Sequence, residues 1–410
     1  MAPALLGIVV LIICACTATP SSPAPNAPGP LKIGILVPFT ESAIDSDVGA
    51  SQRRAADLYL KLKGGLLAGR EVQLVYNDES ALDPSVNKTR IQQFLQQDHV
   101  DLLLGGVGTP AAYLLRDTAE ASKLVYIDTN APANALTRAP AGCTPSCKST
   151  FVFRSAPSSW QLSEPLGEWE SKSGRKDFFV VTADDAFGTE SAAAFIEGFA
   201  KNGGTASGRT TVPAKSGADW AKIIAAVKAQ PAKNVFAAFV SDDAEGFLGA
   251  WDSGGMRAAG YTLAGPGPLT DQQVLVATKQ AAVGATTSFP WSSEVDNAEN
   301  KAFTDEFKKA YKDDTTGQPL APDGYASLMW TTMRALEEAL KTTKGATKDT
   351  AAFVAALEKA SFKGPAGDIA FDPATHAAVQ DMYIREVRAS GGGLVNAVVD
   401  KIGSVRDPAQ

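Results

Sequence analysis

Residues 31–40 read Leu-Lys-Ile-Gly-Ile-Leu-Val-Pro-Phe-Thr, and this stretch opens the pattern that decides the fold. Its first seven residues form a short apolar run that a proline ends, which is typical of a buried strand. A helical pattern follows at 49–63, stops at Gly64-Gly65, and gives way to a second strand-like run at 71–76. Strand, helix and strand in this order predict a parallel sheet with helices on its faces.

The same alternation continues along the chain. The next predicted elements are a helix at 85–97, a strand at 100–104, a helix after Pro110 and a strand at 124–128. The pattern breaks at 129–150, and a second series follows. Its predicted strands are 177–181, 205–212, 234–240, 261–264 and 285–289, and its predicted helices are 187–201, 220–229 and 245–253. The last predicted elements are helices at 297–312, 322–341 and 350–360 and a short strand-rich tail.

Length and rhythm together define the fold class. A chain of 410 residues exceeds what one hydrophobic core usually organises, so two lobes are expected on size alone. Strands that alternate with helices in both halves predict an α/β protein with two doubly wound, Rossmann-like lobes.

The N-terminus has the pattern of an export signal. The apolar run at 5–13 is too short to span a bilayer, and a Pro/Ser/Ala-rich segment follows it. Ile13-Cys14-Ala15-Cys16 resembles the lipobox of bacterial lipoproteins, which implies a signal peptide at 1–15 and a lipid anchor on Cys16. Residues 16–30 are then expected to be a flexible tether. The alternative is an ordinary secretory signal that leaves a soluble protein.

Charge and cysteines exclude two classes of partner. The formal net charge is −7 without a basic stripe, which argues against nucleic acid. Cys143 and Cys147 are the two cysteines beyond the signal, and export favours a disulfide between them. A zinc site would need two further ligands, and His99 and His376 have no suitable spacing to this pair. No metal is expected.

The ordered motifs resemble one family over nearly the whole mature chain. From Leu31 onward the sequence is similar to the type I periplasmic binding proteins, in particular the Leu/Ile/Val-binding branch that serves ABC importers. The resemblance is carried by the motifs Ile33–Thr40, Gly49-Ala50, Val75–Ser80 with Asp83-Pro84, Leu104–Thr109, Phe151–Arg154, Phe187-Gly188, and Phe362–Gly367 with Phe371-Asp372 and His376.

The resemblance implies an architecture and a role. Three crossovers would join lobe one, residues 31–154 and 290–368, to lobe two, residues 155–289 and 369–410. The hinge would lie near Arg154, Phe289 and Phe371. The expected protein is a monomeric solute-binding lipoprotein on the outer face of the cell membrane. It would close on an amino acid or a related carboxylate or amide and dock on an ABC permease. The alternative is a ligand-sensing subunit with the same fold.

Ligand contacts from the first lobe are expected where its parallel strands end. Ligands of open α/β sheets gather there, and helix N-termini offer free N–H groups to anions. Gly108 and Thr109 stand at such a helix start, so a ligand carboxylate is expected to meet the Thr109 hydroxyl and nearby amides. The alternative is that Thr109 only caps its own helix. By resemblance, Thr129, Asn130 and Ala131 form a second binding loop.

The second lobe is expected to supply the remaining contacts. Phe187 would cover an apolar part of the ligand, and Ser241 and Asp242 would accept hydrogen bonds from an ammonium group. The alternative for these two residues is an N-cap cluster for the following helix. By resemblance, Gly267 stands where the family adds a contact to the ligand amine. This position carries no acid, which leaves Asp242 as the main counter-charge and puts an amino-acid ligand in doubt.

Enzyme classes find little support in the sequence. Gly106-x-Gly108-x-x-Ala111 formally fits a dinucleotide fingerprint, but it follows the third strand of its lobe rather than the first. Neither a Gly-x-Ser-x-Gly elbow nor a Walker motif occurs, and both histidines are expected to be structural. The sequence therefore predicts a binding protein without cofactor or catalytic residues.

Overall fold

The computed structural model describes residues 29–81, 83–139, 148–215, 217–314, 316–391 and 393–409. The predicted signal peptide, Cys16, nearly all of the tether, and both Cys143 and Cys147 lie outside these residues, so the lipid anchor and the disulfide stay predictions.

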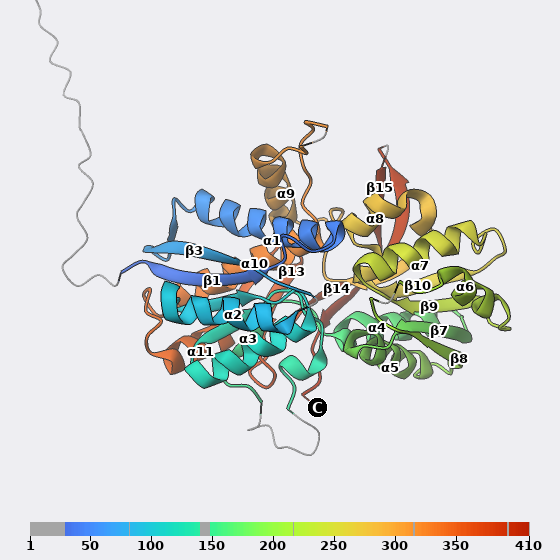
Figure 1. The fold of residues 1–410 in the computed structure, drawn as a ribbon, viewed down its shortest axis with the longest axis horizontal. Coiled ribbons are helices and arrows are strands. Elements are labelled where there is room, and N and C mark those ends of the chain that lie inside the picture. Colours follow the sequence, from blue (N-terminus) through green and yellow to red (C-terminus); the bar gives the residue numbers. More distant parts are fainter. Residues whose placement is uncertain are drawn as a thin grey trace, which may run out of the picture.

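The first sheet has the strand order β2-β3-β1-β4-β5-β6, and every pairing except that of β2 with β3 is parallel. Its strands are β1 (Leu31–Val37), β2 (Leu66–Leu67), β3 (Arg70–Asp78), β4 (Leu102–Gly105), β5 (Val125–Asp128) and β6 (Val152–Arg154). The connecting helices are α1 (Ala43–Leu62), α2 (Pro84–Gln93), with the short π-helix Phe94–Asp98 after it, and α3 (Thr109–Ser122). Figure 1 places α1 on one face of this sheet and α2 and α3 on the other.

The second sheet has the order β12-β13-β14-β11-β10-β9-β7-β8, and β15 pairs with β14. Its parallel strands are β7 (Asp177–Ala183), β8 (Thr205–Val212), β9 (Asn234–Ala238), β10 (Thr262–Pro266) and β11 (Thr286–Phe289). The helices of this series are α4 (Ser159–Lys172), α5 (Ala186–Ala200), α6 (Trp220–Lys228), α7 (Ser241–Ser253) and α8 (Gln272–Thr278). The C-terminal elements are α9 (Ala298–Ala310), α10 (Gly324–Thr342), α11 (Thr350–Glu358), β12 (Ser361–Gly364), β13 (Gly367–Phe371), β14 (Ala378–Ser390) and β15 (Gly393–Val405).

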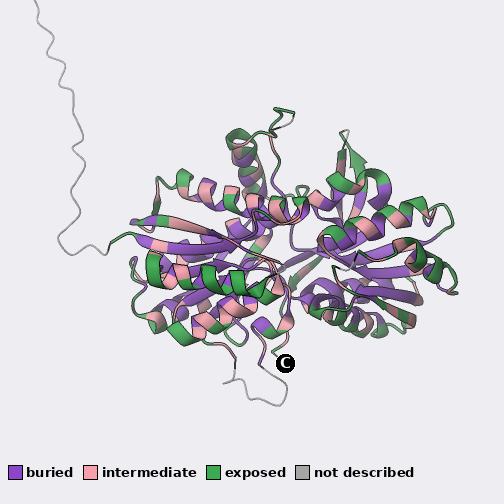
Figure 2. Cartoon of the chain, viewed as in Figure 1, coloured by how far each residue is buried: buried purple, intermediate pink, exposed green. Residues whose placement is uncertain are grey.

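Figure 1 shows two lobes side by side. We call the first sheet with α1 to α3 and α9 to α11 lobe 1, and strands β7 to β11 with α4 to α8 lobe 2. The inner strands of both sheets are largely buried because helices cover them on both faces, whereas the strands β8 and β15 and the outer helix surfaces are more exposed (Figure 2). The expected α/β class with two doubly wound sheets is confirmed.

The predicted hinge residues lie where the chain passes between the lobes. Arg154, Phe289 and Phe371 are all buried. The Arg154 backbone N–H donates to the His376 carbonyl at 3.1 Å, which ties the first crossover to the loop before β14. The lobe boundaries and the hinge motion itself stay predictions.

Helix α4 is the main element that the sequence prediction missed. It contains Pro165 in its interior, a residue that normally ends or kinks a helix. A capping box at its start, in which Ser158 and Gln161 bond reciprocally, is the signal that would have indicated it. Helices α1 and α7 also begin earlier than expected, at Ala43 and Ser241.

Candidate ligand-binding site between the lobes

Side chains from both lobes meet at the carboxyl ends of the parallel strands. The Ser241 hydroxyl, directly after β9, donates to Asp45 at the start of α1. Lys215, in the loop after β8, places its Nζ 3.8 Å from the other Asp45 oxygen. A second bridge joins Gln273 of α8 to Asp323, the N-cap of α10, at 2.6 Å. The two lobes are therefore in direct contact around the predicted site.

Glu79 occupies the anion position that the sequence assigned to a ligand. It follows β3, and its carboxylate accepts from the backbone N–H groups of Val107 and Gly108 at 2.8 and 2.6 Å. The side chain is buried, and this burial raises the pKa of Glu79 to about 8 against the lowering effect of the two amides. Two of the free amides at the start of α3 are thus already bonded within the chain.

Thr109 remains available for a ligand. The N-cap of α3 is Gly108, which makes no side-chain cap bond, so Thr109 does not cap its own helix. Its hydroxyl makes no hydrogen bond to any residue that the structure describes, and its side chain is half-buried. A partly exposed hydroxyl without a partner beside two saturated amides is suited to a polar group from outside the chain.

The loop after β5 is held mostly by internal bonds. The Thr129 hydroxyl donates to Gln52 at 2.8 Å, and the Ala131 N–H donates to Asp128 at 2.9 Å. Both residues are fully buried. Asn130 is more accessible: its side-chain N–H donates to the Val107 carbonyl at 3.1 Å, next to the start of α3. In the predicted second binding loop, Asn130 is the residue whose side chain is partly exposed.

Lobe 2 contributes Phe187, Ser241 and Asp242. Phe187 lies in the first turn of α5 and is 4% exposed. Asp242 is exposed in the first turn of α7 and makes no hydrogen bond or ion pair with a described residue. The N-cap of α7 is Val240, and no side chain caps this helix. Ser241 therefore reaches across to lobe 1 instead of capping.

Gly267 is fixed by packing. It is buried at the end of β10, and a Cβ at this position would lie 2.4 Å from a ring carbon of Phe289. Arg385 lies over the same ring, with its guanidinium carbon 4.8 Å from the ring centre, and donates to the Gly267 carbonyl at 3.4 Å. The structure thus explains why no larger residue stands here.

The sequence pattern did not indicate Lys215, Asp45 or Glu79 as contacts at the candidate site. Lys215 has a φ of 52°, its backbone N–H donates to Asp243 at 2.8 Å, and its side chain is 46% exposed. A lysine just beyond the carboxyl end of β8 was a usable signal, because that end faces the other lobe. Its charge is near enough to Glu79 to lower the pKa of that carboxyl.

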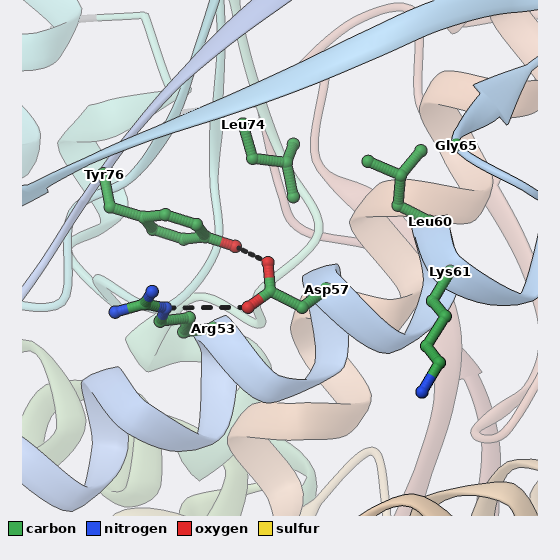
Figure 3. A pocket seen from close by; sticks show the side chains of 7 residues that line it. All are labelled: Arg53, Asp57, Leu60, Lys61, Gly65, Leu74 and Tyr76. Carbon is green, nitrogen blue, oxygen red and sulfur yellow. Dashed lines mark hydrogen bonds and ion pairs between the residues drawn. The ribbon is translucent and has the colours of Figure 1, made fainter.

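A separate hollow of about 490 Å³ lies on lobe 1, between α1, β3 and the turn at Gly65. Figure 3 shows Asp57 between Arg53 and Tyr76, with Leu60 and Leu74 along the wall and Lys61 at the edge. The Tyr76 hydroxyl donates to Asp57 at 2.7 Å. None of the predicted ligand contacts lines this hollow, so we separate it from the candidate site.

Neither metal nor membrane-spanning elements are found in the described part of the chain. There, no group of three or more His, Cys, Asp or Glu side chains could hold a metal ion. A search of the same residues finds no helix that is long and apolar enough to cross a bilayer.

The fold and the contact between the lobes define a two-lobed binding protein. The family model described as periplasmic binding protein matches residues 30–393, and the chain belongs to this family. It is a type I periplasmic binding protein and has the role of the solute-binding component of an ABC transporter. Members of the family bind small molecules and deliver them to a permease; they are not enzymes.

Individual relatives are distant but cover almost the whole chain. The Leu/Ile/Val-binding protein homolog 6 of Brucella suis biovar 1 (strain 1330) is 26% identical over 380 residues, 92% of this chain and 93% of the relative. A solute-binding protein from Rhodopseudomonas palustris BisB5, solved with 3,4-dihydroxybenzoic acid, is 28% identical with a TM-score of 0.82, over 92% and 98% of the two chains. Another from R. palustris, solved with benzoate, is also 28% identical, with a TM-score of 0.78 over 92% and 96%.

Proposed function

We propose that this chain is a lipid-anchored solute-binding protein whose ligand is a small aromatic carboxylate, held between the lobes. The observation that carries the proposal is the cation at the site. Lys215 is half-exposed beside Asp45. The backbone N–H groups of Val107 and Gly108 already donate to Glu79, so they are not free for a ligand carboxylate. A ligand carboxylate would pair with the Lys215 ammonium and accept from the Thr109 hydroxyl, a charge-assisted arrangement.

The apolar contacts and the relatives agree with an aromatic acid. Phe187 is 4% exposed, so a ligand ring would touch only the small exposed part of its ring. Gly267 has no side chain to receive an ammonium group, and the Phe289 ring leaves no space for a side chain at this position. The two R. palustris proteins were solved with benzoate and with a dihydroxybenzoic acid.

Branched-chain amino acids are the second candidate. The Brucella relative carries the name of a Leu/Ile/Val-binding protein homologue and spans nearly the whole chain. Asp242, exposed and without a partner among the described residues, would then receive the ligand ammonium.

Thermal unfolding with a panel of solutes tests the ligand class. Benzoate, 4-hydroxybenzoate and 3,4-dihydroxybenzoate are expected to raise Tm, whereas leucine, isoleucine and benzamide are expected to leave it unchanged. A ligand at about 100 times its Kd stabilises the folded state by roughly 2.7 kcal/mol, a shift of several degrees. A response to leucine and none to the aromatic acids would reverse the assignment.

The anchor is tested separately in cells. Replacement of Cys16 by Ser is expected to move the protein from the membrane fraction to the soluble fraction. Cys14→Ser is the matched control and is expected to stay with the membrane. Mass spectrometry of the mature N-terminus would report the lipid directly, and an unmodified mature terminus would contradict the anchor.

A further inference from the structure

The end of lobe 1 that lies opposite the candidate site carries an exposed apolar and basic surface. Two of its residues, Leu62 and Leu66, are 47% and 43% exposed, and both stand beside the turn at Gly64-Gly65. Lys61, Lys344 and Lys348 are exposed and make no ion pair or hydrogen bond through their ammonium groups with the described residues. We call these five residues the basal patch.

Arg70 contacts both segments that carry the basal patch. Its guanidinium donates to the Gly345 carbonyl at 2.9 Å and to the Thr347 hydroxyl at 3.1 Å, which fixes the loop that carries Lys344 and Lys348. Arg70 itself begins β3 and pairs with Leu67, the neighbour of Leu66. The exposed leucines and the two lysines of this loop therefore share one end of the lobe.

The same arginine holds the point where the described chain begins. Its Nε donates to the Gly29 carbonyl at 3.0 Å. In Figure 1, β1 begins at the end of lobe 1 that lies away from lobe 2. Cys16 stands thirteen positions before Gly29, a distance of at most about 45 Å for a fully extended chain. An anchor on Cys16 would keep this end of the lobe close to the bilayer.

The charges at the basal patch fit an anionic surface. The nearby carboxylates of Glu337 and Glu338 are paired with Lys63 and Lys341. Glu71, opposite Leu66, is exposed and makes no ion pair with a described residue, so it offsets part of the positive charge of the unpaired lysines. Exposed leucines ringed by lysines have the composition of surfaces that lie at a lipid headgroup layer.

We propose that the basal patch rests on a lipid surface rich in anionic headgroups and orients lobe 1 with its candidate site away from the membrane. This proposal rests on the proposed lipid anchor for its biological setting, but the contact itself does not need the anchor. Helix α1 has 20 residues and is about 30 Å long, with Asp45 at the site end and Leu62 in the basal patch. The protein would take up its ligand in this orientation and would leave this contact to deliver the ligand to the permease.

Vesicle binding of the unlipidated chain tests the contact. The chain from Thr17 to Gln410 contains every residue of the described fold. At low salt it is expected to cosediment with vesicles of equal parts phosphatidylcholine and phosphatidylglycerol more than with phosphatidylcholine alone. The difference is expected to disappear at about 1 M salt, where the screening length falls to roughly 3 Å.

Charge variants test whether vesicle binding depends on the basal patch or on electrostatic attraction of the whole protein to anionic vesicles. Lys61→Glu with Lys344→Glu is expected to reduce partition about tenfold or more, because each basic residue near such a surface contributes about a fivefold factor. Glu71→Lys, at an exposed unpaired acid beside Leu66, is expected to increase it about fivefold. Lys222→Glu with Lys279→Glu in lobe 2 is the matched control and is expected to bind like the parent chain.

The outcomes distinguish this proposal from the proposed function. Equal binding to both vesicle types, or equal loss in the lobe 2 control, would overturn the basal patch as a lipid contact. A Tm shift with benzoate in every variant would show that the fold and the ligand site are intact. The absence of any such shift in the parent chain would count against the ligand assignment and leave the vesicle result standing.

Discussion

Two helices, α3 and α7, begin at the face between the lobes, and the residues at their starts make different hydrogen bonds. At α3, the Glu79 carboxylate takes the backbone amides of Val107 and Gly108. At α7, no side chain caps the first turn, and Ser241 bonds to Asp45 of the other lobe instead. The start of α3 is thus capped by a carboxyl group of its own lobe, whereas the start of α7 has no side-chain cap and its first residue bonds to the other lobe.

The bond at α3 is expected to affect the stability of the fold, whereas the bond at α7 is expected to affect the closure of the two lobes. The bond at α3 belongs to lobe 1 in any arrangement of the lobes. The bond at α7 and the Lys215 to Asp45 pair both join the two lobes, so we expect them to break when the lobes separate. Substitutions at the two helix starts are therefore expected to act on different measurements.

The largest effect is expected at Glu79. Glu79→Leu leaves two N–H groups at the start of α3 without an acceptor, at roughly 1–3 kcal/mol for each. We expect a loss of about 3 kcal/mol in the free energy of unfolding, measured by urea titration. Glu71→Leu, at an exposed position of the same lobe, is the control. An unchanged urea midpoint would mean that Glu79 does not hold this helix start.

A pH dependence is expected from the same carboxyl. Burial raises the pKa of Glu79 from 4.5 to about 8, so the folded state binds this proton more tightly than the unfolded state. Its contribution to stability is therefore complete below pH 4.5 and is lost as the pH rises toward 8. Urea titrations across this range should show a steeper decline for the parent chain than for Glu79→Gln. Parallel curves would contradict the raised pKa.

Ligand affinity is expected to depend on Lys215. Lys215→Met removes the ammonium and retains most of the apolar stem, and we expect benzoate to bind about tenfold to a hundredfold more weakly because a charge-assisted bond is lost. Calorimetry gives the Kd. Lys222→Met serves as control, since Lys222 lies in α6. Unaltered benzoate affinity in Lys215→Met would remove this residue from the site.

The smallest effect is expected at Ser241. Ser241→Ala keeps the backbone at its φ of 50° but loses the bond to Asp45, and we expect a roughly fivefold weaker ligand affinity from about 1 kcal/mol of lost closure. Ser241→Gly loses the same bond but relieves the positive φ, so it should lie closer to the parent in stability. Small-angle scattering with and without ligand would report closure directly.

The fold could be predicted because its information is local. Apolar strands such as 31–37 and their alternation with helices are visible in a window of a few residues. Helix α4 was not predicted because Pro165 argues against a helix, and the capping box of Ser158 and Gln161 is a weaker signal than a proline. Rules based on local sequence fail here because the packing around Pro165 accommodates a proline inside a helix.

The site was only partly predictable because it depends on side-chain reach. Thr109 and Ser241 were predicted as ligand contacts from their places after strands. Glu79 was missed because its bond to Gly108 joins positions 29 residues apart, which no local pattern records. Lys215 and Asp45 lie in different lobes, and their ion pair forms because of the way the lobes pack together. The sequence of either segment alone therefore does not predict this pair.

The packing at Gly267 limits how this protein can change its ligand. A Cβ at Gly267 would meet the Phe289 ring, and Arg385 holds that ring from above. An acidic side chain for a ligand amine cannot be introduced at Gly267 by one substitution, because the Phe289 ring has to move first. A route toward an acidic side chain at Gly267 therefore passes through Phe289 and Arg385 first, and each intermediate has to keep this part of the core intact.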